Sequence, residues 1–383
     1  MARPKPLPAA RFSAGNFLAE SATADLVYFL CNVGDADAQL VLLPPDPVTK
    51  FRQAIVVDAG ARDKLPRLID DLIGQKIMAD DGPDARGSIA LVVATHPHDD
   101  HVAGLAQLID RFGEFRRISE FWDPGYWHTI PAYHEAMGAI AQQAHIVYAQ
   151  PTSGFRRWIG LTTAITVLSP SVQLRNRFDT YGTDINDASV SLRIEAPATR
   201  VTRDPQGHRI VRPRSSRLVL GADAQTLSWS FVMSDFPYLS VPVSEQGRLL
   251  DVGSGVDALR ADVLKVSHHG SKHGVNLELV ERMAPALTLV SSVPGPGKYG
   301  FPHTVAQELI REALQATAGS NSAVTRSDDA DLNLFYTADT DDGNPAKPLG
   351  TIGVLLTKGQ WTMWRFGDRA DQPIDLTKGV RWT

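Results

Sequence analysis

The sequence predicts a layered α/β fold. Short apolar runs bounded by Gly, Asp or Pro recur along the chain, as expected of buried strands. Segments with apolar residues at helical spacing separate blocks of these runs, which favours stacked α and β layers over an all-β sandwich. A chain of 383 residues, 43% hydrophobic and 21% charged, is long and apolar enough to form a large core.

The predicted elements follow in chain order. The Pro- and Ala-rich residues 1–24 predict a loosely held arm, and residues 25–383 a single domain. Apolar runs without helical periodicity predict strands at 25–34, 39–44, 54–60, 88–95, 164–170, 188–196, 217–224, 261–267, 351–357 and 360–366. Apolar residues at helical spacing predict helices at 63–77, 102–112, 130–144 and about 304–316. Two insertions, the arginine-rich 200–217 and the Asp/Ser/Thr/Gly-rich 318–347, predict surface loops or hairpins.

Charge and cysteine content limit the partners and the compartment. A net charge of −5 argues against a globally basic nucleic-acid binder and leaves room for a local basic patch. The single cysteine, Cys31, lies in an apolar run and predicts a buried thiol and a reducing, cytoplasmic setting. No run approaches the ~18 apolar residues that a membrane span needs, so we expect no membrane partner.

The most informative stretch is HPHDDH, residues 96–101, between a predicted strand and a predicted helix. His96 and His98 are two residues apart, so in extended backbone their side chains point to the same side and can bind one ion. Asp100 and His101 follow where the chain turns, and they are placed to reach a second ion. Imidazole and carboxylate ligands suit Zn²⁺, Mn²⁺ or Fe, and the lack of thiolates argues against a closed structural zinc site. The alternative is a polar turn in which an aspartate caps the helix.

Residues of the same chemical types follow predicted strands elsewhere. The stretch VSHHGSKHG contains His268, His269 and His273, LVLGADA contains Asp223, and KYGFPHT contains His303. Strand ends that converge on one rim are where α/β folds build their sites. Together with the first cluster, these side chains supply enough nitrogen and oxygen ligands for two metal ions.

These motifs resemble a known family. His96, His98, Asp100 and His101 match the HxHxDH signature of the metallo-β-lactamase superfamily. The chain more specifically resembles the soluble metallo-β-lactamase domain of ComEC-type competence DNA-uptake proteins, through VGDADA, VVDAG, THPHDDHVAGL, VLSP with NDASVSL, LVLGADA, ADVLKVSHHGS and KYGFPH, in family order. The likeness covers roughly residues 25–365. It implies a four-layered αββα metallo-β-lactamase sandwich with a two-metal site at its edge.

The resemblance also implies roles for the matching residues. Asp223 would bridge the two ions. One of His268 and His269 would bind the second ion, while the other would support a ligand or contact substrate phosphate. Asp37 and Asp58 would orient ligands or loops, as such sites generally require.

The chain departs from the family pattern in several places. Ala36 replaces a family glycine, which puts any backbone role of that glycine in doubt, and His98 stands where many ComEC-type domains have Asp. The histidine that many superfamily members place between the signature and the bridging aspartate is not identifiable. His128, His134 and His145 are candidates by location, although the last two are expected on the surface of a helix. No apolar run in these 383 residues is long enough to form the permease helices of DNA-uptake proteins, so we do not expect this chain to translocate DNA by itself.

The expected chemistry is hydrolysis. Two metal ions, Zn²⁺ or Mn²⁺, acidify a bridging water to hydroxide and stabilise charge on the attacking and leaving oxygens. The ComEC-like subgroup is associated with nuclease activity, so we expect hydroxide to attack phosphorus. Asp100 and His303 would act in catalysis, His303 by contacting phosphate or donating a proton. Lys272 and Lys298 flank the predicted ligands and are candidates to hold a substrate phosphate.

The arginine-rich insertion is the candidate nucleic-acid contact. It contains a single acidic residue, Asp204. Its six arginines are Arg200, Arg203, Arg209, Arg212, Arg214 and Arg217. Such a stripe can follow a phosphate backbone, and Arg209, Arg212 and Arg214 are the expected substrate contacts. The alternative is a solvated hairpin whose arginines offset the acidic total.

Three functions follow as hypotheses. The first is a cytoplasmic metal-dependent phosphodiesterase or nuclease with a nucleic-acid or nucleotide substrate. The second is a hydrolase of a small ester, lactone or cyclic nucleotide, which would tolerate loss of the arginines. The third is an effector or binding subunit that needs a protein partner or a second copy of itself, with 318–347 as the partner-binding loop or as a disordered segment.

Overall fold

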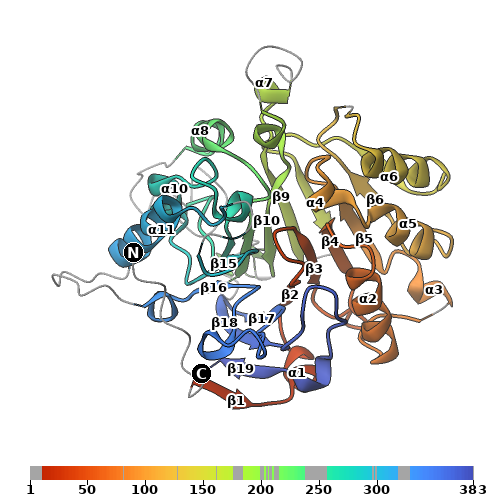
Figure 1. Cartoon of the computed structure of the whole chain (residues 1–383). Coiled ribbons are helices and arrows are strands. Elements are labelled where there is room, and N and C mark those ends of the chain that lie inside the picture. Colours follow the sequence, from red (N-terminus) through yellow and green to blue (C-terminus); the bar gives the residue numbers. More distant parts are fainter. Residues whose placement is uncertain are drawn as a thin grey trace.

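The computed structural model describes residues 11–80, 82–126, 128–160, 162–175, 184–198, 202–203, 206, 209–210, 215–237, 257–295, 297, 300–317 and 328–382. In this part of the chain, two large β-sheets, A and B, pack against each other, and helices cover the outer face of each (Figure 1). A two-stranded hairpin of β11 (Thr202–Arg203) and β12 (Arg209–Ile210) lies apart from both sheets.

Sheet A contains ten described strands in the order β1-β19-β18-β17-β2-β3-β4-β5-β6-β7. In chain order they span Phe12–Ala14 (β1), Leu26–Leu30 (β2), Ala38–Leu42 (β3), Ala54–Ala59 (β4), Ile89–Val93 (β5), Glu120–Trp122 (β6), Val147–Ala149 (β7), Ile352–Thr357 (β17), Gln360–Arg365 (β18) and Val380–Trp382 (β19). Strands β4 to β7 run parallel to one another, and the other pairs are antiparallel.

Sheet B contains seven described strands in the order β16-β15-β14-β13-β10-β9-β8. In chain order they span Arg156–Ile159 (β8), Thr163–Ser169 (β9), Ser191–Ala196 (β10), Ser216–Leu220 (β13), Val263–Lys265 (β14), Leu287–Val290 (β15) and Leu334–Tyr336 (β16). Strands β13 to β16 run parallel.

The α-helices lie mainly outside the sheets. They span Phe17–Ser21 (α1), Lys64–Gly74 (α2), Gly82–Ala85 (α3), Asp99–Val102 (α4), Leu105–Gly113 (α5), Pro131–Ala141 (α6), Val172–Arg175 (α7), Thr226–Asp235 (α8), Leu277–Met283 (α10) and Thr304–Thr317 (α11). Short 3-10 helices span Ile185–Ala188 (η2), Ser267–Gly270 (η3), Asp329–Leu332 (η4), Asp341–Gly343 (η5) and Leu376–Lys378 (η6).

Three apolar cores separate four layers. Alternate residues of β2 show why: Leu26, Tyr28 and Leu30 enter the core between the two sheets, whereas Val27 and Phe29 enter the core beneath α2, α5 and α6. The third core packs sheet B against α8, α10 and α11. A strand buried on both faces reads as a continuous apolar run, which is the pattern in the sequence. The predicted four-layered αββα arrangement is confirmed.

Three sequence expectations need correction. The loosely held arm does not include residues 12–21, because β1 pairs with β19 and Phe17 is buried in the core under sheet A. The insertion expected at 318–347 includes β16, a buried strand of sheet B whose three apolar residues stand alone among polar ones. In the arginine-rich insertion, Arg217 is not a surface arginine, because it lies buried in β13 with its Nε 3.6 Å from Oε1 of Glu195.

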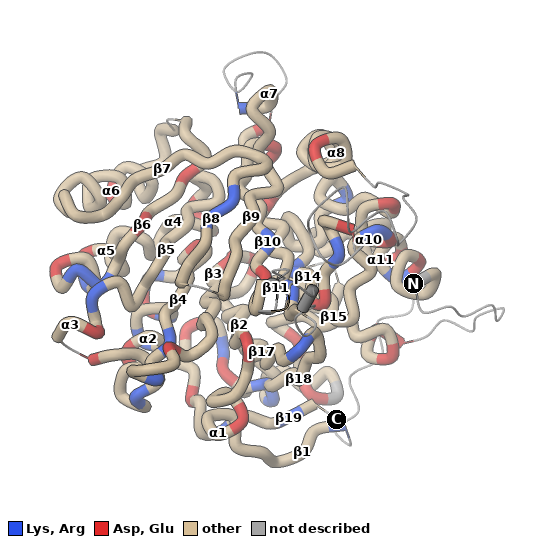
Figure 2. The backbone as a smooth tube through the Cα atoms, turned by 180° about the vertical axis from the view of Figure 1, so that it is seen from behind, with Lys and Arg blue, Asp and Glu red and all other residues tan. Residues whose placement is uncertain are grey.

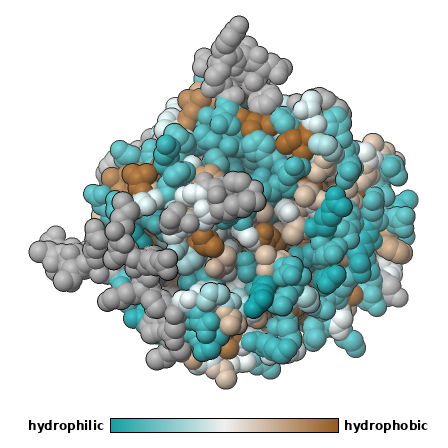
Figure 3. All heavy atoms as spheres, viewed as in Figure 1, coloured by the Kyte–Doolittle hydropathy of each residue, from teal (hydrophilic) through white to brown (hydrophobic). Residues whose placement is uncertain are grey.

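The described surface mixes charges of both signs. Lysine and arginine positions are interspersed with aspartate and glutamate positions along the described backbone (Figure 2). The face seen in Figure 1 is largely hydrophilic, with small separate hydrophobic spots (Figure 3). Among the described residues, no helix combines the length and the apolar character that a membrane crossing requires.

Candidate metal centre

The predicted ligands lie where neighbouring strands end. Asp58 is the second-to-last residue of β4. The loop that carries His96 follows β5, which is parallel to β4. On the other sheet, Asp223 follows β13, and His269 follows β14, which is parallel to β13. Carboxyl ends of parallel strands meet at one sheet edge. A hydrogen bond of 2.9 Å from the Val190 N–H to the Thr95 carbonyl joins the two sheets at this edge.

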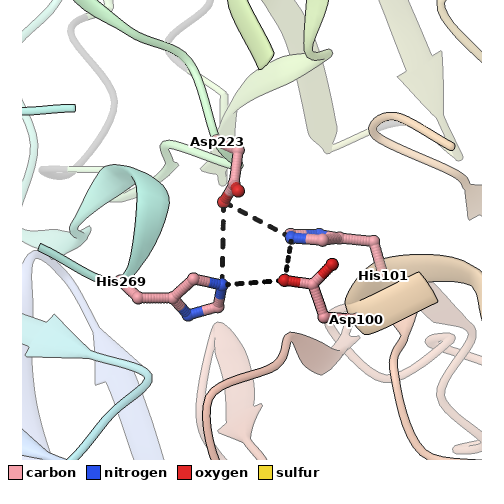
Figure 4. A group of neighbouring side chains, drawn as sticks. All are labelled: Asp100, His101, Asp223 and His269. Atoms are coloured by element: carbon pink, nitrogen blue, oxygen red, sulfur yellow. Dashed lines mark ion pairs between the residues drawn. The ribbon is translucent and has the colours of Figure 1, made fainter. Parts of the chain in front are cut away.

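Four side chains converge on one point: Asp100, His101, Asp223 and His269 (Figure 4). His101 Nε2 lies 3.4 Å from Oδ1 of Asp223 and 3.7 Å from Oδ2 of Asp100. His269 Nε2 lies 3.9 Å and 3.6 Å from the same two oxygens. Within the described residues, His101 Nε2, His269 Nε2 and Asp223 Oδ1 are buried without a hydrogen-bond partner. Buried polar atoms are rarely left this way, and three aimed at one point fit a shared cation.

The surrounding protein fixes which imidazole nitrogen faces this point. Nδ1 of His101 donates to Asp58 Oδ2 at 2.7 Å, and Nδ1 of His269 donates to the Ser291 carbonyl at 2.9 Å. The Thr95 hydroxyl donates to Asp58 at 2.8 Å, so it can accept from Nδ1 of His96, 3.1 Å away. Each Nε2 then presents a lone pair, as metal ligands require.

A second set of donors lies on the other side of Asp223. Oδ2 of Asp223 is 3.7 Å from His96 Nε2 and 3.6 Å from His268 Nε2. His96 Nε2 is in turn 3.1 Å from Nδ1 of His98. Asp223 therefore faces His101 and His269 with one oxygen and His96 and His268 with the other.

A neighbouring acidic group is already neutralised. Asp37, Asp58 and His101 also lie close enough to share an ion. However, Lys265 on β14 forms a fully buried ion pair with Asp37, and Asp58 is bonded to His101. The ammonium of Lys265 supplies the positive charge at Asp37. We therefore interpret Asp37, Asp58 and Lys265 as residues that support the candidate ligands and do not bind an ion of their own.

The histidines differ in their tendency to bind protons. Burial lowers the pKa of His96, of His98 and of His268, which keeps these imidazoles neutral near pH 7. Neutral imidazole is the form that binds a cation.

Electrostatics around His101 work in the opposite direction. Burial lowers its pKa, but the carboxylates of Asp223, Asp58 and Asp100 outweigh burial and raise it. Burial also lowers the pKa of His269, but the negative charge of Asp223 outweighs burial, and the pKa of His269 is raised. The centre thus has a negative field that attracts cations, whether protons or metal ions.

His303 and Lys272 lie at the rim. His303 Nδ1 accepts a 3.1 Å hydrogen bond from the backbone N–H of Lys272, so its Nε2 carries the proton and is a donor. The Phe301 ring contacts three imidazoles, with centroids 5.1 Å from His268, 6.1 Å from His269 and 5.2 Å from His303. The Lys272 side chain is exposed.

The other predicted residues divide into two groups. His128 is half-buried with its ring centroid 6.3 Å from that of His98, while His134 lies on α6 and His145 beyond it. Lys298, Arg212 and Arg214 lie outside the described residues, as does the side chain of Arg209.

Four residues of the centre were not predicted from the sequence: Lys265, Thr95, Ser291 and Phe301. The sequence does contain an indication for Lys265, because a lysine inside an apolar strand needs a buried partner of opposite charge. The other three are ordinary residue types that only their contacts identify.

Comparisons with known proteins complete the description. No protein-family model matches the chain, and no curated protein matches it. Among solved structures, the chain is similar to the metallo-beta-lactamase fold protein YhfI from Bacillus subtilis, with 14% identity, a TM-score of 0.35 and coverage of 76% of this chain and 93% of that one. It is also similar to Zn²⁺-bound PqqB from Methylobacterium extorquens, with 10% identity, a TM-score of 0.37 and coverage of 82% and 98%. Human tRNase Z, short form, gives 12% identity, a TM-score of 0.33 and coverage of 70% and 92%. All three TM-scores are below 0.5.

Proposed function

We propose that the protein is a metal-dependent hydrolase that cleaves phosphodiester bonds in nucleic acid. The observation that carries the metal dependence is the set of three buried, unpaired donor atoms aimed at one point. The ComEC-type resemblance of the motifs and the arginine-rich insertion support the substrate class.

Charge balance supports two divalent ions. Asp37, Asp58, Asp100 and Asp223 place four carboxylates within one small region, and Lys265 is the only cationic side chain paired with them among the described lysines and arginines. Asp37, Asp58 and Asp223 are buried, and uncompensated buried charge is costly. Two divalent ions would offset these charges, lower the pKa of a nearby water and stabilise charge on phosphate oxygens.

The protein's own groups then have separable tasks. His96, His98, Asp100, His101, Asp223 and the histidines of η3 would hold the ions. Asp58 and Ser291 keep the His101 and His269 rings in the required orientation. His303 Nε2–H and the Lys272 ammonium at the rim would donate to phosphate oxygens.

The first experiment combines metal content with hydrolysis. Purified protein is assayed for bound Zn²⁺ and Mn²⁺, then for cleavage of linear DNA and of bis-p-nitrophenyl phosphate. The test variant is Asp100→Ala with His101→Ala. The matched control is Asp99→Ala, an exposed carboxylate in the same short helix, α4.

We expect bound metal and DNA cleavage in the wild type and in Asp99→Ala, and neither in the double variant. Cleavage of the small ester without DNA cleavage, and without dependence on salt, would move the assignment to a small substrate. Bound metal without any hydrolysis would support a partner-dependent effector. A wild type that binds no metal would contradict the proposal.

A further inference from the structure

We infer that His268 and His269, although adjacent in sequence, hold different metal ions. His269 would join the ion of Asp100, His101 and Asp223. His268 would complete the ion held by His96 and His98, in place of a histidine from the segment between the signature and Asp223. The inference rests on the proposed function, because it assumes two ions at this centre.

The backbone turns the two imidazoles to different sides of Asp223. His268 and His269 both have left-handed backbone, with φ of 49° and 51°. Consecutive non-glycine residues rarely adopt this region, which costs free energy at each position. The His268 N–H bonds the Ala222 carbonyl at 2.8 Å, and Ala222 is itself left-handed, with φ of 48°. The two strained turns are thus tied together with Asp223 beside them.

The distances assign one histidine to each carboxylate oxygen. His268 Nε2 lies 3.6 Å from Oδ2 of Asp223, whereas His269 Nε2 lies 3.9 Å from Oδ1. Oδ2 is also the oxygen that His96 Nε2 approaches, at 3.7 Å. Donors bound to one zinc ion at about 2.0–2.1 Å in a tetrahedron lie roughly 3.3 Å apart. The separations around Oδ2 are close to that value, and the separation of 3.1 Å between His96 and His98 is as well.

The His268 ring is held for this role from two sides. Phe301 packs against it, and the side-chain amide of Gln225 lies 3.5 Å from Nδ1. Only 14% of the side chain is exposed. Nε2 is therefore the nitrogen directed at Asp223. The competing candidate is His128, which lies beside His98 but contacts its ring only at a centroid distance of 6.3 Å.

The test variant is His268→Gly. Glycine accepts a φ of 49° without strain, so the substitution removes the imidazole and leaves the turn able to form. His269→Gly, at a φ of 51°, is the matched comparison. His273→Ala changes an exposed histidine four residues after His269, and His128→Ala tests the competitor. Circular dichroism and thermal unfolding verify that each variant is folded.

Two readouts other than activity are used: zinc per chain after desalting, and the visible absorption of Co²⁺-loaded protein. We expect two ions in the wild type, in His273→Ala and in His128→Ala, and one ion in each glycine variant. The Co²⁺ spectra of the two glycine variants should differ, because each retains a different site. Added imidazole should restore the second ion to His268→Gly by occupying the vacated space.

Retention of two ions with wild-type affinity in His268→Gly would overturn the inference and leave His268 as a proton donor. Loss of one ion in His128→Ala, with two retained in His268→Gly, would overturn it in favour of His128. The proposed function fails separately: a wild type with two ions that hydrolyses no phosphodiester contradicts the substrate class, whichever histidines hold the ions.

Discussion

Asp58 shows how a single side chain fixes a ligand next to it. It accepts hydrogen bonds from the Thr95 N–H and hydroxyl, both at 2.8 Å, and from His101 Nδ1 at 2.7 Å. Burial raises the pKa of Asp58, and the bond to His101 partly offsets this. A carboxylate on Nδ1 keeps the proton on that nitrogen and makes Nε2 a stronger ligand.

Replacing Asp58 by Asn should therefore weaken metal binding. Asn tolerates the left-handed φ of 60° at this position, so the fold should be retained. We expect a loss of about 10–100-fold in metal affinity, measured by competition with a chromogenic chelator. Asp63→Asn is the control, because that side chain is 56% exposed. Equal affinities for both variants would show that Asp58 does not support the ligand.

Cys31 should be chemically inert in the folded protein. The thiol is 1% exposed, and burial raises its pKa to about 12. At pH 8 roughly one thiol in ten thousand would be ionised, and the thiolate is the reactive form. We expect no reaction with a thiol-specific disulfide reagent in the native state and one equivalent after unfolding in guanidinium. Rapid native reaction would mean that the chain around Cys31, directly after β2, opens readily.

Among the elements, the residue that follows β4 and the first turn of α4 approach each other through their backbones. A Cβ atom added at Gly60 would lie 2.0 Å from the Asp100 carbonyl oxygen. The Asp37 N–H donates to the same carbonyl at 3.0 Å, and the Gly60 N–H donates to the Asp37 carbonyl at 2.7 Å. The backbone segments around Asp37, Gly60 and Asp100 are thus held together at a point where only glycine fits at position 60.

Gly60→Ala should displace α4, which carries Asp100 and His101. We expect loss of at least one bound ion and a destabilisation of about 1–3 kcal/mol, because neither backbone can move away without breaking hydrogen bonds. Metal analysis and urea unfolding measure the two effects. Gly74→Ala, at the end of α2 with nothing within 4 Å of the added carbon, should leave both unchanged. The two substitutions differ only in what surrounds the same methyl group.

Elements with a strong signal were found from the sequence, and weak ones were not. Strands β2 to β5 are buried on both faces, so each is mainly apolar, with Gln39 in β3 and Asp58 in β4 as the polar exceptions. The strand β6 has three residues, and α8, with the sequence TLSWSFVMSD, has no single apolar stripe. Such elements are stabilised by neighbours far away in the chain, which local periodicity does not reveal.

At the scale of the whole molecule, the centre joins the two sheets. The signature loop follows β5 of sheet A, whereas Asp223 and His269 follow β13 and β14 of sheet B. A metal ion bound by side chains from both sheets would stabilise the native state relative to the unfolded state. Metal binding should therefore appear in the global unfolding transition.

We expect chelation with EDTA to lower the melting temperature at pH 8 by about 5 °C, for ions present at about a hundred times their dissociation constants. The difference should shrink as the pH falls. His101 and His269 have raised pKa values in the metal-free field, so at lower pH protons stabilise the metal-free fold and compete with the ions. Calorimetry at pH 8 and pH 5.5, with and without EDTA, measures both effects. A difference that is constant or grows at low pH would contradict proton competition at these histidines.

The layered α/β class, the strand ends that carry the site and most of the candidate ligands can be predicted from the sequence. These follow from local information: apolar runs, residue spacing and the clustering of His and Asp. The sequence does not distinguish the roles of His268 and His269, and it does not reveal the buried ion pair between Lys265 and Asp37. Only the tertiary structure separates the two histidines, because their left-handed backbone and the position of Asp223 between strands of sheet B decide which oxygen each one faces. Distances between residues far apart in the chain arise from packing, and no local pattern encodes them.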